Sequence, residues 1–560
     1  MTKKFLMVLI VGGPVIVVAI GVALMRAGPG SDIQPLAAGT LRGANILLVT
    51  IDTLRADHVG AYGSAGALTP TFDALAKDGL RFDRTYAHVP LTLPSHASLL
   101  TAAYPSRNGV HDNGTFRLSE DWPTAATALK AGGYRTGAFV GAFVLDARFG
   151  LNRGFDVYDD RMLGSGSDLE VVQRSAEQVL APAYDWITGA APDTRNPAVS
   201  AKDAAPGTTH TAPWFAWIHL YDPHEPYTPP EPYRSRYAAE PYDGEIAYAD
   251  ASLGAFVARL RSAGALANTL IVVTSDHGES LGEHAERTHG LFAYDVTLRV
   301  PLVFSVEPAG QAPRPIRQGA FNDTMRLVDI VPTMLDLVGA APMPQADGRS
   351  VRPFISGERP FDDPGSYFEA LNANLSRDWA PLKGLVRERL KLIDLPEAEL
   401  YDLSLDAAEA HNLYARDRDR ARDLEARLDR ITKAAAGPVT PSAIDADAEA
   451  RLRSLGYVVG SATRPARTYT AADDPKRLVH LNTALDDAAA MWTRGDAAQA
   501  METLRGVIRE RPAMTQAYDR LAFMLRASGH PDEAAALLEE AARQHHGDRQ
   551  LGRIEGLKQR

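Results

Sequence analysis

The chain of 560 residues contains no cysteine, and this absence excludes several kinds of chemistry at once. Without cysteine the protein has no disulfide bond, no cysteine nucleophile and no zinc–thiolate site. The absence does not fix the compartment, but it permits an oxidising one without any risk of mispaired thiols. Any nucleophile and any metal ligands must therefore come from oxygen or nitrogen side chains.

Positively charged residues are also fewer than negatively charged ones. Lysine and arginine number 59 against 70 aspartate and glutamate residues, which gives a formal net charge of −11. Proteins that bind nucleic acids need basic patches to neutralise phosphates, so we expect no nucleic-acid partner. The hydrophobic and charged fractions, 45% and 23%, are ordinary for a globular protein, and the length predicts several domains.

One long stretch without charge lies near the N-terminus. Lys3 and Lys4 precede an uncharged run over residues 5–25. About 20 apolar residues cross the hydrocarbon core of a bilayer as a helix, so we predict an uncleaved anchor within residues 1–30, with its N-terminal lysines in the cytoplasm. A cleaved signal peptide ending near Ala38 is the alternative, although its apolar core is usually shorter. Both interpretations place the body of the protein outside the cytoplasm.

Two largely apolar segments each end in an aspartate. Residues 45–51 lead into Asp52, and residues 270–275 lead into Asp276. Continuous apolar runs of this length are typical of strands buried in a parallel sheet. Ligands bind at the C-terminal ends of such strands, so both carboxylates are candidate ligands or catalytic groups. The alternative that Asp52 caps a following helix remains open at this point.

Between these acids in the sequence, a hydroxyl lies in a turn restricted by prolines. Pro90 and Pro94 flank Thr92, and the residue before each proline is pushed away from helical conformation. We expect Ser95 to cap a helix formed by the apolar run over residues 97–101. A hydroxyl just ahead of a helix N-terminus faces free N–H groups, which suits a nucleophile that attacks an anionic ester. A turn that only leads into a helix is the alternative.

The acids also define a candidate metal site. His277 directly follows Asp276, and two carboxylates with one imidazole suit Ca²⁺, Mg²⁺, Mn²⁺ or Zn²⁺. Strands alternate with helical segments over about 300 residues, a pattern that predicts a doubly wound α/β sheet.

Taken together, these segments resemble the sulfatase branch of the alkaline phosphatase superfamily. The resemblance covers roughly residues 44–433. In chain order, the matching stretches are residues 45–52, 92–101, 104–110, 222–227, 275–283, 289–290 and 298–302, followed by residues 385–393, 399–403 and 412–413, which are similar to the family's small C-terminal sheet.

The resemblance implies a fold and a set of ligands. The fold is an alkaline-phosphatase-like, doubly wound, mostly parallel α/β sheet with a small C-terminal sheet subdomain. The ligands are Asp52, Asp276, His277 and the Thr92 oxygen, which would hold one divalent metal ion. Zinc, manganese, magnesium and calcium all remain open as its identity.

The resemblance also implies catalytic roles for two histidines. His224 and His289 match family residues that contact the ester oxygens or protonate the leaving group, and Thr92 matches the nucleophile. His289 stands where many sulfatases have a lysine.

Three departures from the sulfatase pattern restrict the chemistry. Thr92 stands where sulfatases carry a cysteine or serine that is converted to formylglycine, and threonine cannot be converted because its β-carbon carries a methyl group. His96 stands at an arginine position. Thr53 stands where many sulfatases have a second acid, which weakens a calcium assignment. A threonine nucleophile is typical of phosphate-handling branches, including phosphodiesterases and the phosphoethanolamine transferases that residues 275–283 resemble.

We therefore expect a metal-dependent hydrolase or transferase that acts on phosphate mono- or diesters through a covalent Thr92 intermediate. A sulfuric ester hydrolase with an unmodified threonine is one alternative, and a weakly active scaffold that binds protein partners is another. The expected partners are a phosphate- or sulfate-ester substrate, with lipids and envelope glycans as candidates, and the membrane through residues 5–25. The catalytic domain is expected in the periplasm or outside the cell.

The C-terminal part contains two similar segments. Gly495 and Gly529 begin related stretches 34 positions apart, which is the length of a tetratricopeptide repeat. A chance pair of helical hairpins is the alternative. Because about three repeats are usually needed for a free-standing array, we expect these two to lean on the catalytic domain or on a partner, and to bind protein or peptide.

The domain organisation predicted from these observations has six parts. They are an anchor or signal over residues 1–30, a linker over 31–43, a sulfatase-like catalytic domain over 44–366, its small sheet subdomain over 367–433, a second linker over 434–475 and two tetratricopeptide repeats over 476–550.

Overall fold

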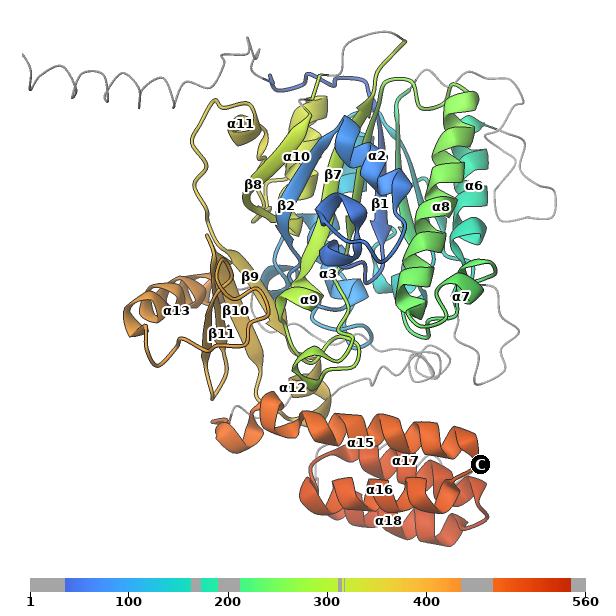
Figure 1. Cartoon of the computed structure of the whole chain (residues 1–560), viewed down its shortest axis with the longest axis vertical. Helices are drawn as coiled ribbons and strands as arrows, with labels where there is room; N and C mark the ends of the chain where they lie inside the picture. The colour runs from blue at the N-terminus through green and yellow to red at the C-terminus, as the bar shows by residue number, and fades with distance from the viewer. Residues whose placement is uncertain are drawn as a thin grey trace, which may run out of the picture.

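The computed structural model of the chain (Figure 1) describes residues 36–162, 173–189, 212–310, 315–316, 318–434 and 467–544. The predicted membrane span over residues 5–25 and most of the second predicted linker lie outside the described residues. Within the described ranges, no helix combines the length and the apolar character needed to cross a membrane.

The main sheet has eight strands in the order β4-β3-β5-β1-β6-β7-β2-β8. Strand β7 runs antiparallel to both of its neighbours, and every other pairing is parallel, which confirms the predicted mostly parallel α/β sheet. The strands are β1 (Asn45–Ile51), β2 (Leu80–Tyr86), β3 (Arg135–Val140), β4 (Val157–Asp159), β5 (Trp214–Leu220), β6 (Thr269–Ser275), β7 (Arg299–Glu307) and β8 (Gly319–Arg326).

Helices cover both faces of this sheet, and β1 shows why its sequence is apolar throughout. Alternate side chains of a strand point to opposite faces. Ile46 and Leu48 are buried under α3 (Thr92–Thr101), α5 (Ala125–Ala131) and α10 (Leu327–Val338). Leu47 and Val49 are buried under α2 (Pro70–Asp78), α6 (Ala176–Thr188) and α8 (Pro241–Ser262). The continuous apolar run of β1 therefore packs into a hydrophobic core on each face of the sheet.

Short helices connect these elements. The short α-helices are α4 (Pro105–Asn108), α7 (Tyr233–Arg236), α9 (Asp295–Leu298), α11 (Arg352–Ile355) and α12 (Asn372–Arg377). The 3-10 helices are η1 (Ala56–His58), η2 (Gly60–Tyr62), η3 (Phe143–Leu145), η4 (Ala147–Phe149), η5 (Glu283–Ala285) and η6 (Ala471–Asp473).

A second, smaller sheet follows the catalytic sheet in the chain. Its four antiparallel strands have the order β12-β11-β10-β9. Helix α13 (Arg418–Lys433) packs on it through Leu424 and Leu428, which share a buried cluster with Leu385 and Leu392. The strands are β9 (Ser366–Ala370), β10 (Leu382–Arg387), β11 (Leu390–Asp394) and β12 (Glu399–Asp402).

The C-terminal helices form two pairs that lie together beside α12 (Figure 1). They are α15 (Pro475–Arg494), α16 (Ala497–Glu510), α17 (Thr515–Ala527) and α18 (Pro531–Gln544). Gly495 and Gly529, the residues that revealed the repeat period, both have left-handed φ angles, 93° and 85°, in the turns after α15 and α17. Arg377 of α12 donates to Asn482 of α15 at 2.8 Å, so the repeats do lean on the catalytic part of the chain.

Helix α3 begins earlier than the sequence suggested. Its first residue is Thr92, preceded by Leu91 in extended conformation. The predicted capping role of Ser95 is wrong, because this residue lies inside the helix and its hydroxyl donates to the Asp276 carbonyl at 2.6 Å. Pro94 is tolerated because it lies in the first turn, where the missing N–H has no intrahelical partner to lose.

Candidate active site

Strand pairing brings the two predicted carboxylates together. Ile51 of β1 pairs with Ser275 of β6, so Asp52 and Asp276 emerge side by side at the same edge of the sheet. Asp52, Asp276 and His277 are all fully buried, and one ligand atom from each lies within 4.8 Å of the others. The alternative for Asp52 is not realised, because the next helical turn begins after Arg55 and has no side-chain cap.

Thr92 belongs to the same group. Its side chain is 1% exposed, and Oγ1 donates to Asp52 Oδ2 at 3.4 Å. Because Thr92 is the first residue of α3, the hydroxyl lies at the end of the helix where free N–H groups and the positive end of the dipole favour an anion.

The group contains buried atoms that find no hydrogen-bond partner among the described residues: Asp52 Oδ1, Asp276 Oδ2 and His277 Nε2. Leaving such a group unpaired costs about 1–3 kcal/mol. His277 Nε2 lies 3.7 Å from Asp52 Oδ1 and 3.6 Å from Asp276 Oδ2. Two donors bound to one tetrahedral Zn²⁺ are about 3.4 Å apart, so the spacing suits ligands around a cation.

The surroundings orient these donors for a cation. His277 Nδ1 lies 2.9 Å from the Gly278 carbonyl, so it carries the proton and leaves the lone pair on Nε2. The other Asp276 oxygen, Oδ1, accepts hydrogen bonds from the Thr53 and His277 backbone amides at 3.2 and 2.9 Å. The residues therefore fit a divalent metal ion by donor type, spacing and tautomer.

The pKa values of the two carboxylates also indicate a site for a cation. Burial raises the pKa of Asp52 to about 7, against the lowering effect of His277, and the charge of Glu279 adds to the increase. Burial also raises the pKa of Asp276, and the neighbouring Asp52 raises it further. Two adjacent buried carboxylates are stable as anions only when positive charge is close, and a divalent cation would supply it.

The two predicted catalytic histidines lie next to this group. The His289 ring is 4.6 Å from the His277 ring and 5.0 Å from the His224 ring, measured between centroids. His289 Nδ1 lies 2.8 Å from Glu279 Oε1, and the Tyr227 hydroxyl donates to Glu279 Oε2 at 2.9 Å. Burial lowers the pKa of His289 to about 4. Neither Glu279 nor Tyr227 was predicted from the sequence as part of the site.

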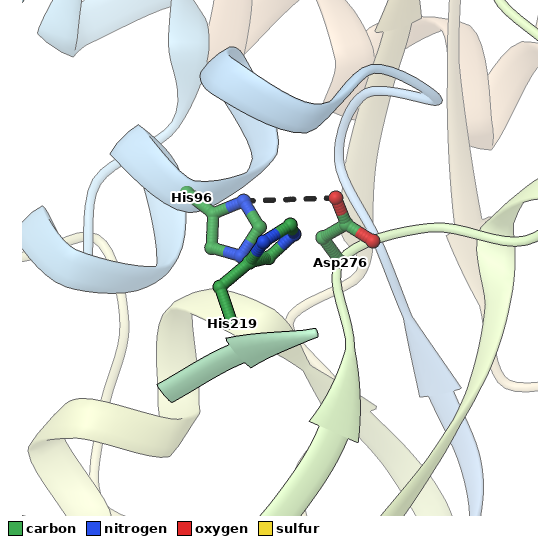
Figure 2. A group of neighbouring side chains, drawn as sticks. All are labelled: His96, His219 and Asp276. Carbon is green, nitrogen blue, oxygen red and sulfur yellow. Dashed lines mark ion pairs between the residues drawn. The ribbon is translucent and has the colours of Figure 1, made fainter. Parts of the chain in front are cut away.

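Two further histidines lie beside this group of residues. Figure 2 shows His96 on α3 and His219 at the end of β5, close to Asp276. His96 was noticed only as a departure from the arginine of sulfatases, and His219 was missed. The sequence shows only a histidine in the otherwise apolar run of β5. Its pairing with Thr50 of β1 appears only in the structure.

Comparison with known proteins identifies the family. The model of the sulfatase family matches residues 44–340, more than half of the chain, and the chain belongs to this family. A model for the C-terminal part of N-sulphoglucosamine sulphohydrolase matches residues 282–434, and a tetratricopeptide repeat model matches residues 491–555. The protein is thus a sulfatase-type hydrolase of the alkaline phosphatase superfamily with C-terminal repeats.

Individual relatives agree with this class. An N-acetylglucosamine-6-O-sulfatase of Bacteroides thetaiotaomicron is 24% identical over 506 residues, covering 70% of this chain and 89% of the relative. Human arylsulfatase A is 27% identical over 373 residues, covering 59% and 71%. The phosphonate monoester hydrolase of Agrobacterium radiobacter has a similar fold, with a TM-score of 0.55 and 22% identity over 70% of this chain and 95% of that one.

Proposed function

We propose that the protein is a divalent-metal-dependent hydrolase or transferase that acts on phosphate mono- or diesters through a covalent bond to Thr92. The observation that carries this proposal is the position of the Thr92 hydroxyl, at the first residue of α3 and 3.4 Å from Asp52 Oδ2. Threonine cannot become formylglycine, and this supports the unmodified hydroxyl as the proposed nucleophile.

The chain's own residues account for each step. Thr92 Oγ1 loses its proton to solvent and attacks phosphorus in line with the ester bond, and the bond to the leaving group breaks as the phosphothreonine forms. Water or an acceptor alcohol then cleaves the phosphothreonine and restores the hydroxyl. His224 and His289 contact the ester oxygens or protonate the leaving group. A bound divalent ion supplies positive charge that lowers the pKa of the Thr92 hydroxyl and polarises the ester.

A sulfate ester is the second candidate substrate. It is supported by the names of the relatives, since both curated relatives above are sulfatases. Under this alternative the unmodified Thr92 hydroxyl attacks sulfur in the same geometry. A weakly active scaffold that works through its repeats is the third candidate, and it is supported by the tetratricopeptide match alone.

The decisive experiment compares Thr92→Ala, Thr92→Ser and the unmodified protein on an aryl phosphate, a diaryl phosphate and an aryl sulfate. We expect the unmodified protein to prefer the phosphate esters and Thr92→Ala to lose about 10⁴-fold or more in kcat. Thr92→Ser keeps the hydroxyl and serves as the matched control, with activity well above that of Thr92→Ala. Intact-protein mass spectrometry after an acid quench should detect a phosphoryl group on Thr92. Full activity in Thr92→Ala contradicts the proposal.

We further propose that the protein works outside the cytoplasm, anchored by residues 5–25, and that the repeats bind a protein partner. The uncharged run and its flanking lysines support the first statement, and the tetratricopeptide match supports the second. Fractionation of cells that produce the full chain or a chain starting at residue 31 tests the anchor. Only the full chain should sediment with membranes.

A further inference from the structure

His219 has an environment that ordinary packing does not explain. It lies one residue before the end of β5, it is fully buried, and neither of its ring nitrogens makes a hydrogen bond within the described residues. A buried imidazole without partners costs free energy, about 1–3 kcal/mol for each unpaired polar atom. Such an atom in a native structure needs an explanation, and a bound ion or water molecule can supply one.

A carboxylate of the candidate metal site lies close to His219. His219 Nε2 lies 3.3 Å from Asp52 Oδ2, the same oxygen that accepts the Thr92 hydroxyl at 3.4 Å. Both distances are close to the separation of about 3.4 Å between two donors of one Zn²⁺ ion, whose tetrahedral ligand set can expand to five. Asp52 thus presents one oxygen toward His277 and the other toward His219.

His219 also approaches Asp276. One ligand atom each from His219, Asp276 and His96 lie within 4.8 Å of one another, and Figure 2 shows the three side chains converging. Asp276 therefore belongs both to this group and to the group formed with Asp52 and His277.

The hydrogen bonds separate the roles of the two imidazoles in Figure 2. His96 Nδ1 donates to the Thr92 carbonyl at 2.7 Å, and its Nε2 is 3.0 Å from the Thr50 hydroxyl. Both nitrogens of His96 are therefore engaged, and Nδ1 must keep its proton because a carbonyl only accepts. His219 alone of this pair has a free lone pair for a cation.

We propose that His219 is an additional ligand of the divalent ion, which makes the donor set two imidazoles, two carboxylates and the Thr92 oxygen. This inference rests on the proposed function only for the presence of one metal ion. Two nitrogen donors favour Zn²⁺ over Ca²⁺ and Mg²⁺, which prefer oxygen, so the proposal also selects among the metals that the sequence leaves open.

The test measures metal binding by the full-length protein rather than its activity. The metal-free protein is titrated with Zn²⁺ in competition with a chromophoric chelator, and the bound metal is counted by elemental analysis. We expect one ion per chain, and His219→Ala should weaken the affinity by at least about 100-fold, more than typical outer-shell losses. The matched control is His96→Asn, which removes a neighbouring buried imidazole and should change the affinity by less than about 10-fold.

A spectroscopic readout identifies the ligand directly. With Cu²⁺ as the probe ion, electron paramagnetic resonance of the unmodified protein should show nitrogen couplings from two imidazoles. His219→Ala and His277→Ala should each leave one, whereas His96→Asn should leave both. Circular dichroism of the metal-free variants checks folding, and His219→Gln replaces His219→Ala if the cavity left by alanine prevents folding.

Three outcomes overturn the proposal. The first is a folded His219 variant with Zn²⁺ affinity within about threefold of the unmodified protein and two nitrogen couplings. The second is two ions per chain, because His219 would then hold a different ion. The third is a protein that binds no divalent ion, which also removes the metal from the proposed function. Loss of phosphate-ester activity alone, with metal binding as expected, contradicts the proposed function and leaves the role of His219 intact.

Discussion

Two buried clusters of ionisable side chains in the same domain are built in opposite ways. In the first, Arg326 is 3% exposed and Asp329 is 2% exposed, and the guanidinium donates to both Asp329 oxygens and to the Tyr104 hydroxyl. In the second, Asp52 and Asp276 lie side by side with no arginine or lysine bonded to them among the residues described, and each keeps an oxygen without a hydrogen bond.

The difference indicates what each cluster is for. A buried charge is tolerated when a partner of opposite charge and a full set of hydrogen bonds accompany it. The Arg326 cluster carries its own cation and needs nothing more, so it serves the fold. The Asp52 cluster lacks a fixed cation and has donors at ligand spacing, so it is completed only by something that binds.

The largest effect on stability is expected from breaking the Arg326 cluster. Arg326→Met leaves Asp329 buried without its partner and should lower the free energy of unfolding by about 3–5 kcal/mol. Urea denaturation measures this loss. The double variant Arg326→Met with Asp329→Leu is the control, and it should recover most of the stability. Zn²⁺ affinity should not change in either variant. A change in affinity would mean that the two clusters are not independent.

A smaller effect is expected from removing the metal from the other cluster. Chelation should destabilise the protein by about 2.7 kcal/mol relative to a solution whose free metal concentration is 100 times the dissociation constant. Differential scanning calorimetry with and without chelator measures the shift in Tm. Asp276→Asn should be insensitive to chelator, because its ligand set is incomplete. A chelator effect of equal size in this variant would contradict the assignment of the site.

The smallest effect on stability is expected from a third, separate pair of ionisable side chains, one of which is a histidine whose charge depends on pH. His111 pairs with the buried Glu369 of β9. Burial lowers the pKa of His111, but the charge and hydrogen bond of Glu369 outweigh it, so the pKa lies above its ordinary value. The pair's contribution should therefore be complete below about pH 6.5 and should be lost as the pH rises through the raised pKa.

A stability-against-pH series on the unmodified protein and on the double variant His111→Gln with Glu369→Gln measures this contribution. The difference in free energy of unfolding between the two proteins should shrink by about 1 kcal/mol between pH 6 and pH 9. A difference that grows with pH would have the wrong sign and would show that His111 is neutral in the folded protein.

Much of the fold could be predicted because its signals are local. The apolar runs of β1 and β6 predicted buried strands, and the acids after them predicted the sheet edge at which Asp52 and Asp276 lie together. The spacing of Gly495 and Gly529 predicted the repeats. Each of these signals lies within a few residues or in a simple period. Thr92 was selected as a candidate for the same reason, since two prolines flank it in the sequence.

His219 could not be found in this way, because its significance depends on register. Only the pairing of β5 with β1 places it beside Thr50, and from there near Asp52. A single histidine in a strand carries no information about a strand far away in the sequence. The cap predicted at Ser95 failed for a related reason, because the hydroxyl has a tertiary partner in the Asp276 carbonyl that competes with the local role.

The contact between the repeats and the catalytic part of the chain has a thermodynamic consequence. Arg287, two residues before His289, forms an ion pair with Asp487 of α15 at 2.7 Å. The first repeat helix therefore touches the segment that carries a predicted catalytic histidine. If a partner bound the repeats more tightly in one position of α15 than in another, it would bias that segment, and the substrate would change the partner's affinity by the same factor. The repeats and the active site would then share one coupling free energy, and either could be used to measure the other.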